Sequence, residues 1–287
     1  MSLVNPMEFI KKAQQKGIGI ASFNVHNLET VQAVIEGAEA EKCPVIIQTT
    51  PGTLNHAGIE YISAIVRAAA EKCSVPVALH VDHCKSFETI IQCIRNGYTS
   101  VMIDTAHLPY DENIAMVKKV VEIAHCVGIA VEGELGRIGG TEDDLSVDER
   151  TATFTVPAEA KDFVDRTDID MLAIAIGTAH GEYKGEPRLD FERLSAIREA
   201  VDCPLILHGA SGIPDYQIKE SLRRGISKIN IATELKIPMA YAIKKCFEEK
   251  PNENDPRNYM GSAKNAVREV VRRKIRLCGG TNFADEL

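Results

Sequence analysis

The sequence predicts an α/β fold, a single TIM (β/α)8 barrel, because eight short apolar segments alternate with amphipathic segments along its 287 residues. Most of the apolar runs are unbroken rather than alternating, which is typical of parallel strands buried on both faces. An open doubly wound sheet would give the same alternation and stays as an alternative, because the sequence does not show whether a sheet closes. The predicted strands are 18–23, 44–50, 76–82, 100–105, 129–135, 171–177, 204–209 and 228–233.

The segments between these strands carry residues suited to helix ends. Glycine adopts positive φ at little cost, so helices are expected to end at Gly97, Gly128 and Gly225. Side chains that cap helix N-termini are expected at Ser86, Asp111, Asp190 and Asp215. After residue 250 the sequence is polar and turn-rich, and 262–277 predicts an additional C-terminal helix. We therefore expect one domain over 1–287, including a C-terminal extension from about 250.

Composition excludes several classes of protein. A formal charge of −8 and a pI near 5.6 argue against a nucleic-acid surface. No stretch approaches the length of a membrane span, and the first residues lack the apolar core of a signal peptide. We expect a cytoplasmic protein whose eight scattered cysteines are free thiols, since the sequence contains no C-x-x-C pair.

Polar side chains gather at one end of the predicted strands. In a TIM barrel the active site is built at the carboxyl ends of the strands, whereas the opposite ends here offer mainly Gly, Pro, Ser and Lys. Taken singly, each polar residue has an ordinary structural explanation, but their collection at one end indicates a site. The residues at these ends are Asn24, His26, Asp82, His83, Asp104, His107, Glu132, Glu134, His180, His208, Asn230 and Thr233.

Three of these residues suggest a metal site. His83, His180 and His208 follow the third, sixth and seventh strands and could converge near the barrel axis. Three imidazoles with an open fourth position are the usual catalytic zinc arrangement. Asp82, next to His83, would place a carboxylate beside the metal, where it is suited to proton transfer.

Two further segments fit a phosphorylated substrate and a lid. "HGASG" (208–212) and "NIAT" (230–233) follow strands seven and eight, where TIM barrels often bind phosphate through backbone N–H groups. "GRIGGTEDDLSVDE" (136–149) follows strand five. Its acidic run is by default a solvated loop, but the Gly139–Gly140 pair offers hinge-like freedom. The alternative hypothesis is that this segment is a lid that carries a catalytic carboxylate.

Five segments, taken in order, resemble the zinc-dependent class II aldolases of ketose bisphosphates. They are "VDH" (81–83), "VEGELGRIGGTEDD" (131–144), "GTAHG" (177–181), "LHGASG" (207–212) and "KINIATEL" (228–235). Within that family, "TPGTLNHAG" (50–58), "GTAHG" and "NIATELK" look closest to tagatose-1,6-bisphosphate aldolases. Fructose-bisphosphate aldolases typically carry N-x-D/N-T where this chain has Ala232 in third place, which leaves the fructose assignment as the alternative.

The resemblance implies the role of each matching residue. Zinc would be held by His83, His180 and His208, and an alternate or second metal site would use Asp104 and Glu134. The dihydroxyacetone-phosphate half would be bound by Gly181, Gly209, Ala210, Ser211, Asn230, Ile231, Ala232 and Thr233. A monovalent cation, Na⁺ or K⁺, can also be required in this family. We expect a homodimer or homotetramer, and tagatose aldolases can work with a separate non-catalytic subunit.

The chemistry implied by the resemblance is cleavage of the C3–C4 bond of a ketose bisphosphate. Zinc would act as a Lewis acid that stabilises the enediolate left after cleavage. Asp82 would take the C4 hydroxyl proton as glyceraldehyde 3-phosphate leaves, and Glu142, on the loop, would protonate the enediolate to dihydroxyacetone phosphate. Arg257, in "DPRNY", is the candidate for the second phosphate.

The sequence disfavours two other functions. A Schiff-base aldolase needs a lysine within an inner strand, whereas Lys228 is expected at the amino end of its strand. A non-catalytic partner subunit, or a sugar-phosphate binding protein, could lose Asp82, a zinc histidine or Glu142, yet all are present. The sequence therefore favours the zinc aldolase.

Overall fold

Eight strands form a closed parallel barrel in the computed structural model, which describes residues 2–142, 145–148, 152–183 and 185–287. The order around the barrel is β1-β11-β10-β8-β5-β4-β3-β2, so the last strand pairs with the first. This confirms the TIM barrel and excludes the open sheet. The barrel strands are β1 (Ile20–Asn24), β2 (Val45–Thr49), β3 (Val77–Cys84), β4 (Ser100–Ile103), β5 (Ala130–Leu135), β8 (Met171–Ile174), β10 (Leu205–Leu207) and β11 (Ile226–Ile231).

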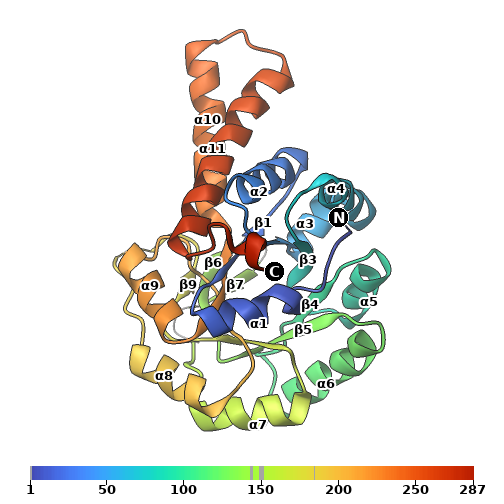
Figure 1. Cartoon of the computed structure of the whole chain (residues 1–287), viewed down its shortest axis with the longest axis vertical. Helices are drawn as coiled ribbons and strands as arrows, with labels where there is room; N and C mark the ends of the chain where they lie inside the picture. Colours follow the sequence, from blue (N-terminus) through green and yellow to red (C-terminus); the bar gives the residue numbers. More distant parts are fainter. Residues whose placement is uncertain (1, 143–144, 149–151, 184) are drawn as a thin grey trace.

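Helices surround the barrel between successive strands, as the alternating pattern predicts (Figure 1). A short turn, η2 (Phe283–Glu286), follows the last helix. The helices are α1 (Met7–Lys16), α2 (Leu28–Ala40), α3 (Pro51–Ala57), α4 (Ile59–Lys72), α5 (Phe87–Arg95), α6 (Tyr110–Cys126), α7 (Pro157–Thr167), α8 (Phe191–Ala200), α9 (Asp215–Arg223), α10 (Thr233–Glu249) and α11 (Pro256–Leu277).

The helix ends follow the sequence prediction in part. The predicted glycines Gly97, Gly128 and Gly225 all have positive φ, and the side chains of Ser86 and Asp190 cap α5 and α8. The predicted caps at Asp111 and Asp215 are wrong, because α6 begins at Tyr110 and α9 at Asp215 itself. Both carboxylates lie instead in the first helical turn, where they interact favourably with the helix dipole.

The barrel interior has an apolar floor beneath a polar layer. Alternate residues of each strand point inward, and the lowest inward side chains pack with α1 and the C-terminal turn. Phe9, Ile10 and Phe283 close this end and are buried. The strand residues of the floor are Ile20, Ile46, Ala78, Met102, Ala130, Met171, Ala173 and Ile206. The floor therefore separates the polar residues above it from solvent below.

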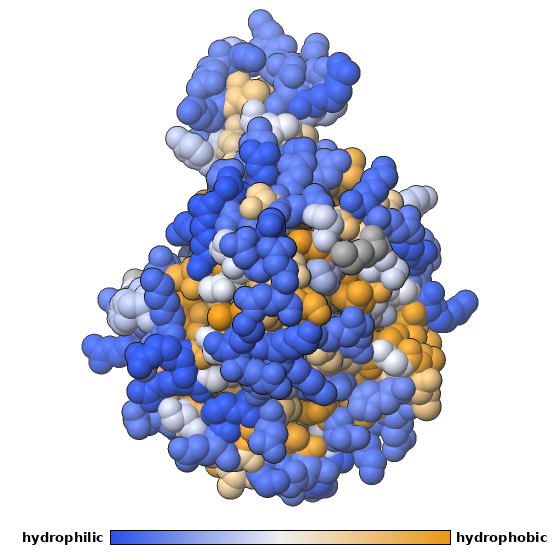
Figure 2. Space-filling view, in the orientation of Figure 1, coloured by the Kyte–Doolittle hydropathy of each residue, from blue (hydrophilic) through white to orange (hydrophobic). Residues whose placement is uncertain are grey.

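Helices α10 and α11 pack against each other and form an arm that extends beyond the barrel (Figure 1). The arm surface is mostly hydrophilic, with a narrow apolar strip (Figure 2). At its base α11 packs on α2, where buried Glu41 accepts hydrogen bonds from Arg272 and Arg276. The predicted C-terminal helix is thus confirmed, although it begins at Pro256 rather than 262.

Two expectations from composition can be compared with this structure. All eight cysteines, which lie within the described residues, are free thiols, as predicted. Over the same part of the chain, no helix combines the length and apolar character that crossing a bilayer requires.

Candidate active site

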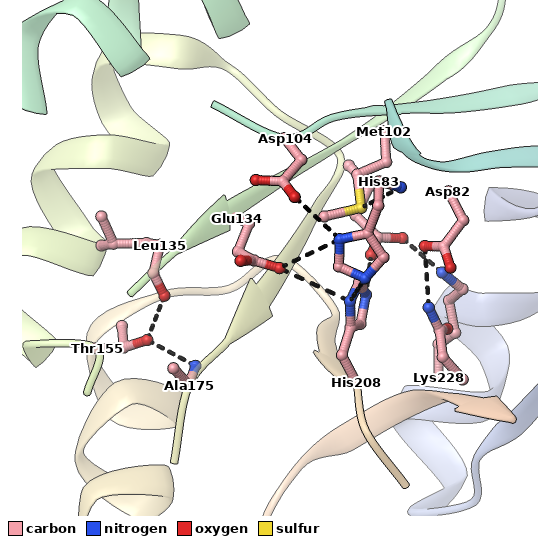
Figure 3. A network of polar contacts seen from close by, with 12 residues as sticks. Asp82, His83, Met102, Asp104, Glu134, Leu135, Thr155, Ala175, His208 and Lys228 are labelled. Atoms are coloured by element: carbon pink, nitrogen blue, oxygen red, sulfur yellow. Dashed lines mark hydrogen bonds and ion pairs between the residues drawn. The ribbon is translucent and has the colours of Figure 1, made fainter. Parts of the chain in front are cut away.

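A bulge in β3 turns two neighbouring side chains, Asp82 and His83, toward the barrel interior (Figure 3). On a regular strand successive side chains point to opposite faces, so only one of them would face inward. The pairing of β3 with β4 shifts register between Val81 and Cys84, and His83 has a positive φ of 49°. Bulges re-aim side chains next to active sites. The left-handed conformation of His83 costs about 1–3 kcal/mol, which the surrounding packing must offset.

Three histidines from separate segments meet beside this bulge. Besides His83, they are His180, in the short strand β9 (Ala179–His180), and His208, which directly follows β10. Nε2 of His83 lies 2.9 Å from Nδ1 of His208, and the ring centroids of His83 and His180 are 4.8 Å apart. One ring nitrogen from each histidine lies within 4.8 Å of the others, and all three residues are buried. The structure therefore brings together the three residues singled out as zinc ligands.

Carboxylates surround the histidines on one side (Figure 3). Asp104 Oδ2 lies 3.0 Å from Nδ1 of His83, and Glu134 Oε2 lies 3.7 Å from Nδ1 of His208. Burial lowers the pKa of His83, but the carboxylates of Asp82, Asp104 and Glu134 outweigh burial and raise that pKa to about 10. Burial raises the pKa of Glu134 well above its usual value, and the Asp104 charge raises it further.

This donor set fits a divalent metal ion. The Oε2 atom of Glu134 is buried and has no hydrogen-bond partner among the described residues. Such an oxygen is costly to bury unless a cation binds it. His83, Asp104 and Glu134 form a second group whose ligand atoms lie within 4.8 Å of one another. Two possible metal positions thus share His83, and one of them consists of imidazoles alone, the arrangement typical of catalytic zinc.

Two amide side chains hold the carboxylate of Asp82. Gln48 Nε2 donates to Oδ2 at 3.0 Å, and Asn230 Nδ2 donates to Oδ1 at 3.1 Å. Gln48 also accepts a hydrogen bond from the hydroxyl of Ser22. Sequence reasoning missed Gln48, although a polar residue within the apolar run "PVIIQTT" was a signal for it. The side-chain amide of Asn230, a residue expected near a phosphate, thus contacts Asp82.

Beneath the histidines lies a buried ion pair between Lys228 and Glu132. The prediction that Lys228 stands at the amino end of its strand is wrong, because β11 begins at Ile226 and Lys228 is fully buried. Its Nζ is 2.6 Å from Glu132 Oε2, and Glu132 Oε1 is 2.8 Å from Nε2 of His208. Although burial raises the pKa of Glu132, Lys228 and His208 lower it below its usual value, so this carboxylate is ionised.

His80 is the third group in this layer. Its Nδ1 lies 2.7 Å from the hydroxyl of Ser100, and its Nε2 lies 3.7 Å from Glu132 Oε2. Burial and the Lys228 charge lower the pKa of His80 to about 3, which keeps its imidazole neutral.

A cavity of about 400 Å³ opens beside the loops that follow β9, β10 and β11, and Gly181 in its lining directly follows His180. Of the residues expected to bind phosphate, Gly181, Ser211 and Thr233 line this cavity. The other expected residues lie beside it in the same loops or in β11, where their side chains are buried. These are Gly209, Ala210, Ile231 and Ala232, which could offer only backbone groups, and Asn230, described above.

The amino end of α10 lies at this cavity. Ser211 Oγ accepts hydrogen bonds from the backbone N–H groups of Ala232 and Glu234. Glu234 itself accepts from the Gly212 N–H at 2.8 Å and is paired with Lys274 at 2.6 Å. Backbone N–H groups at the start of a 17-residue helix are a favourable anion site. Glu234 thus connects Lys274, at the base of the arm, to the loop 208–212.

The predicted lid segment contains a hairpin that pairs with the strand carrying His180. β6 (Gly139–Glu142) is antiparallel to β7 (Leu145–Val147) and parallel to β9, with Gly140 opposite His180. Gly140 has a φ of 97°, and a Cβ at this position would clash with the His180 backbone. Gly140 therefore permits a close backbone approach. Glu142 is the last residue of β6, and its side chain lies outside the described part of the chain.

Two residues considered from the sequence lie away from this site. Arg257 is the second residue of α11, so it lies at the tip of the arm, remote from the barrel of its own chain (Figure 1). Its side chain is 87% exposed and is paired with Asp255. His107 is exposed in the turn between β4 and α6.

Replacement of Gly140 should weaken metal binding. Gly140→Ala adds a Cβ against the His180 backbone, so the hairpin or His180 must shift, and we expect at least a tenfold loss of affinity for a divalent metal. Gly128→Ala is the matched control, because Gly128 also has positive φ but open space around it. Titration of the metal-free proteins measures both constants. Equal affinities in the two variants would contradict a coupling between the hairpin and His180.

Comparisons with known proteins agree with this geometry. The family model described as fructose-bisphosphate aldolase class-II matches residues 4–282. The crystal structure of the YdjI aldolase from Escherichia coli K12 is 38% identical, with a TM-score of 0.88 over 98% of this chain and 99% of that one. A Coccidioides immitis protein provisionally assigned as a fructose-1,6-bisphosphate aldolase is 29% identical, with a TM-score of 0.91 over 99% of both chains.

A more distant structure shares the fold. Fructose-bisphosphate aldolase from Campylobacter jejuni is 21% identical, with a TM-score of 0.79 over 96% of this chain and 94% of that one. The family match covers nearly the whole barrel, including the loops that carry the histidines. The chain therefore belongs to the class II fructose-bisphosphate aldolase family, and it is a carbon–carbon lyase.

Proposed function

We propose that the protein is a zinc-dependent aldolase that reversibly cleaves D-tagatose 1,6-bisphosphate into dihydroxyacetone phosphate and D-glyceraldehyde 3-phosphate. One observation supports this proposal most strongly. Three buried histidines and the Asp82 carboxylate lie at the same end of the barrel as a cavity that opens at the amino terminus of α10. A ketose phosphate needs these three elements together, because its carbonyl, its hydroxyl and its phosphate are recognised separately.

His83, His180 and His208 are the proposed zinc ligands, and Asp104 and Glu134 are the proposed ligands of an alternate or second position. When bound, zinc supplies Lewis-acid stabilisation of the negative charge that develops next to the substrate carbonyl. The choice of zinc is supported by the set of three imidazoles.

Asp82 is the proposed group that takes the C4 hydroxyl proton. Its carboxylate is fixed on both oxygens by the amides of Gln48 and Asn230, so it does not need to reorient during the reaction. A carboxylate held in this way next to the histidines can receive a proton from a substrate hydroxyl and return it in the reverse reaction.

The phosphate of the dihydroxyacetone half is proposed to bind at the amino end of α10 through Gly181, Ser211 and Thr233, with backbone groups of Gly209, Ala210 and residues 230–232. Glu142 is proposed to deliver the carbon-bound proton from the hairpin segment. The proposal also includes Na⁺ or K⁺ near the phosphate, a cytoplasmic homodimer or homotetramer, and a non-catalytic partner subunit.

Tagatose 1,6-bisphosphate is proposed over fructose 1,6-bisphosphate because of Ala232. This position carries Asp or Asn in the fructose-specific pattern, whereas here a small apolar residue lies 2% exposed beside the cavity. The second candidate substrate is fructose 1,6-bisphosphate, which is favoured by the assignment of the Coccidioides immitis relative. The two sugars differ only in the orientation of the C4 hydroxyl, the group assigned here to Asp82.

Removal of the metal should abolish activity. We expect excess chelator to stop cleavage and added zinc to restore it, because Lys228, ion-paired with Glu132 within the closed barrel, is not available for a Schiff base. Borohydride added with substrate should leave every lysine unmodified in a mass spectrum. Full activity in excess chelator, or a trapped lysine adduct, would contradict the metal mechanism.

Substitution of Asp82 should separate proton transfer from metal binding. Asp82→Ala should lower kcat by about 10²–10⁴, the range typical of a general acid–base group. Its zinc content should stay at the wild-type level, because the three histidines do not depend on this carboxylate for their ligand atoms. Loss of zinc together with activity would make Asp82 a support for His83 rather than the base.

The choice between epimers can be tested in one assay. Both bisphosphates yield the same two products, so a single coupled detection of glyceraldehyde 3-phosphate gives kcat/KM for each. We expect the larger kcat/KM for D-tagatose 1,6-bisphosphate. A clear preference for D-fructose 1,6-bisphosphate would overturn the substrate and leave the aldol chemistry unchanged.

A further inference from the structure

The ion pair between Lys228 and Glu132 takes no part in the chemistry described above, yet it contacts one of the metal-binding histidines. Both side chains are fully buried, and their charged atoms are 2.6 Å apart. The other oxygen of Glu132 lies 2.8 Å from Nε2 of His208. Figure 3 shows Lys228 and His208 within the same network of polar contacts. The ion pair is therefore one contact away from the proposed metal.

Two alternative uses of this pair are disfavoured by its surroundings. Glu132 belongs to a group with His80 and Asp82 that could in principle hold another cation. However, the Lys228 ammonium already lies against the Glu132 oxygen that faces His80, so a positive charge occupies that position. A Schiff base at Lys228 would require the lysine to leave Glu132, which would leave a buried carboxylate without its main partner.

The contacts of His208 fix which of its nitrogens carries the proton. A carboxylate only accepts hydrogen bonds, so Nε2 donates to Glu132 and Nδ1 keeps its lone pair. Nδ1 faces Nε2 of His83 at 2.9 Å and Glu134 Oε2 at 3.7 Å, on the side where the three histidines meet. The carboxylate thus orients the imidazole so that its free nitrogen points toward the metal position.

We propose that Glu132 and Lys228 are positioning residues that hold His208 in the orientation and tautomer required of a zinc ligand. Glu132 fixes the imidazole, and Lys228 holds the carboxylate in place and balances its charge. The inference rests on the zinc site of the proposed function. Loss of a hydrogen-bond partner of a metal-bound histidine typically weakens metal binding 10–100-fold, and we expect a loss of that size when either residue is replaced.

Three variants test this role against a purely structural one. Lys228→Met removes the ammonium, Glu132→Gln removes the carboxylate charge, and the double variant contains no unpaired buried charge, so it should fold even if a single variant does not. The matched control is Arg276→Met, which takes a cation from Glu41, a buried carboxylate at the base of the arm. The control should lose stability without any change in metal binding.

Two measurements read the metal site directly. Competition with a chromogenic chelator gives the zinc dissociation constant of each metal-free protein, and the ligand-field spectrum of bound Co²⁺ reports the geometry of its ligands. We expect the single and double variants to bind zinc about 10–100-fold more weakly and to show an altered Co²⁺ spectrum. The Arg276→Met protein should match the wild type in both.

The outcomes distinguish this inference from the function on which it rests. If the folded double variant binds zinc with wild-type affinity and gives the wild-type Co²⁺ spectrum, the ion pair is structural and the inference is wrong. If the wild-type protein itself binds neither zinc nor Co²⁺ at the histidines, the proposed zinc site fails first, and the inference falls with it.

Discussion

The alternation of side chains along the closed parallel strands is the constraint on which the site depends. Once the barrel closes, every second residue of each strand must lie in its interior, where water cannot hydrate it. The lower inward positions are apolar and pack with α1, whereas the upper ones carry Gln48, His80, Glu132 and Lys228. Because polar groups in such a space must be satisfied by one another, the interior is a connected network rather than a set of separate ligands.

The balance of charge within this network explains the shifted pKa values of its side chains. Glu132 is neutralised by Lys228, whereas Asp82, Asp104 and Glu134 contact amide and histidine side chains within the described part of the chain. Burial raises the pKa of Glu134, and the excess of negative charge raises the pKa of both Glu134 and His83, since each added proton relieves part of the repulsion. A divalent cation relieves the same repulsion more effectively, because it interacts with imidazoles and carboxylates together.

Much of the fold could be predicted because each strand is an unbroken apolar run, and the polar strand ends could be predicted because they interrupt those runs. The limits of the strands are harder to predict from the sequence. The last strand begins at Ile226 rather than 228, so Lys228 lies within the strand and not at its edge. The two-residue spacing between Lys228 and Asn230 indicates that both side chains face the barrel interior. The joint inward orientation of Asp82 and His83 depends on a bulge, which is a property of strand pairing. The contact between Gly140 and His180 likewise joins segments that the local sequence treats separately.

The apolar floor formed by Phe9, Ile10, Phe283 and the lowest strand residues makes the barrel a blind-ended well. A hydrated ion or a sugar phosphate does not cross such a layer, so the proposed metal and substrate would both enter at the other end. The hairpin that pairs with β9 lies beside that opening and contacts the backbone of a histidine that faces the metal position. If zinc and a ketose bisphosphate bind as proposed, both would use the same opening, so a bound sugar would hinder exchange of the ion.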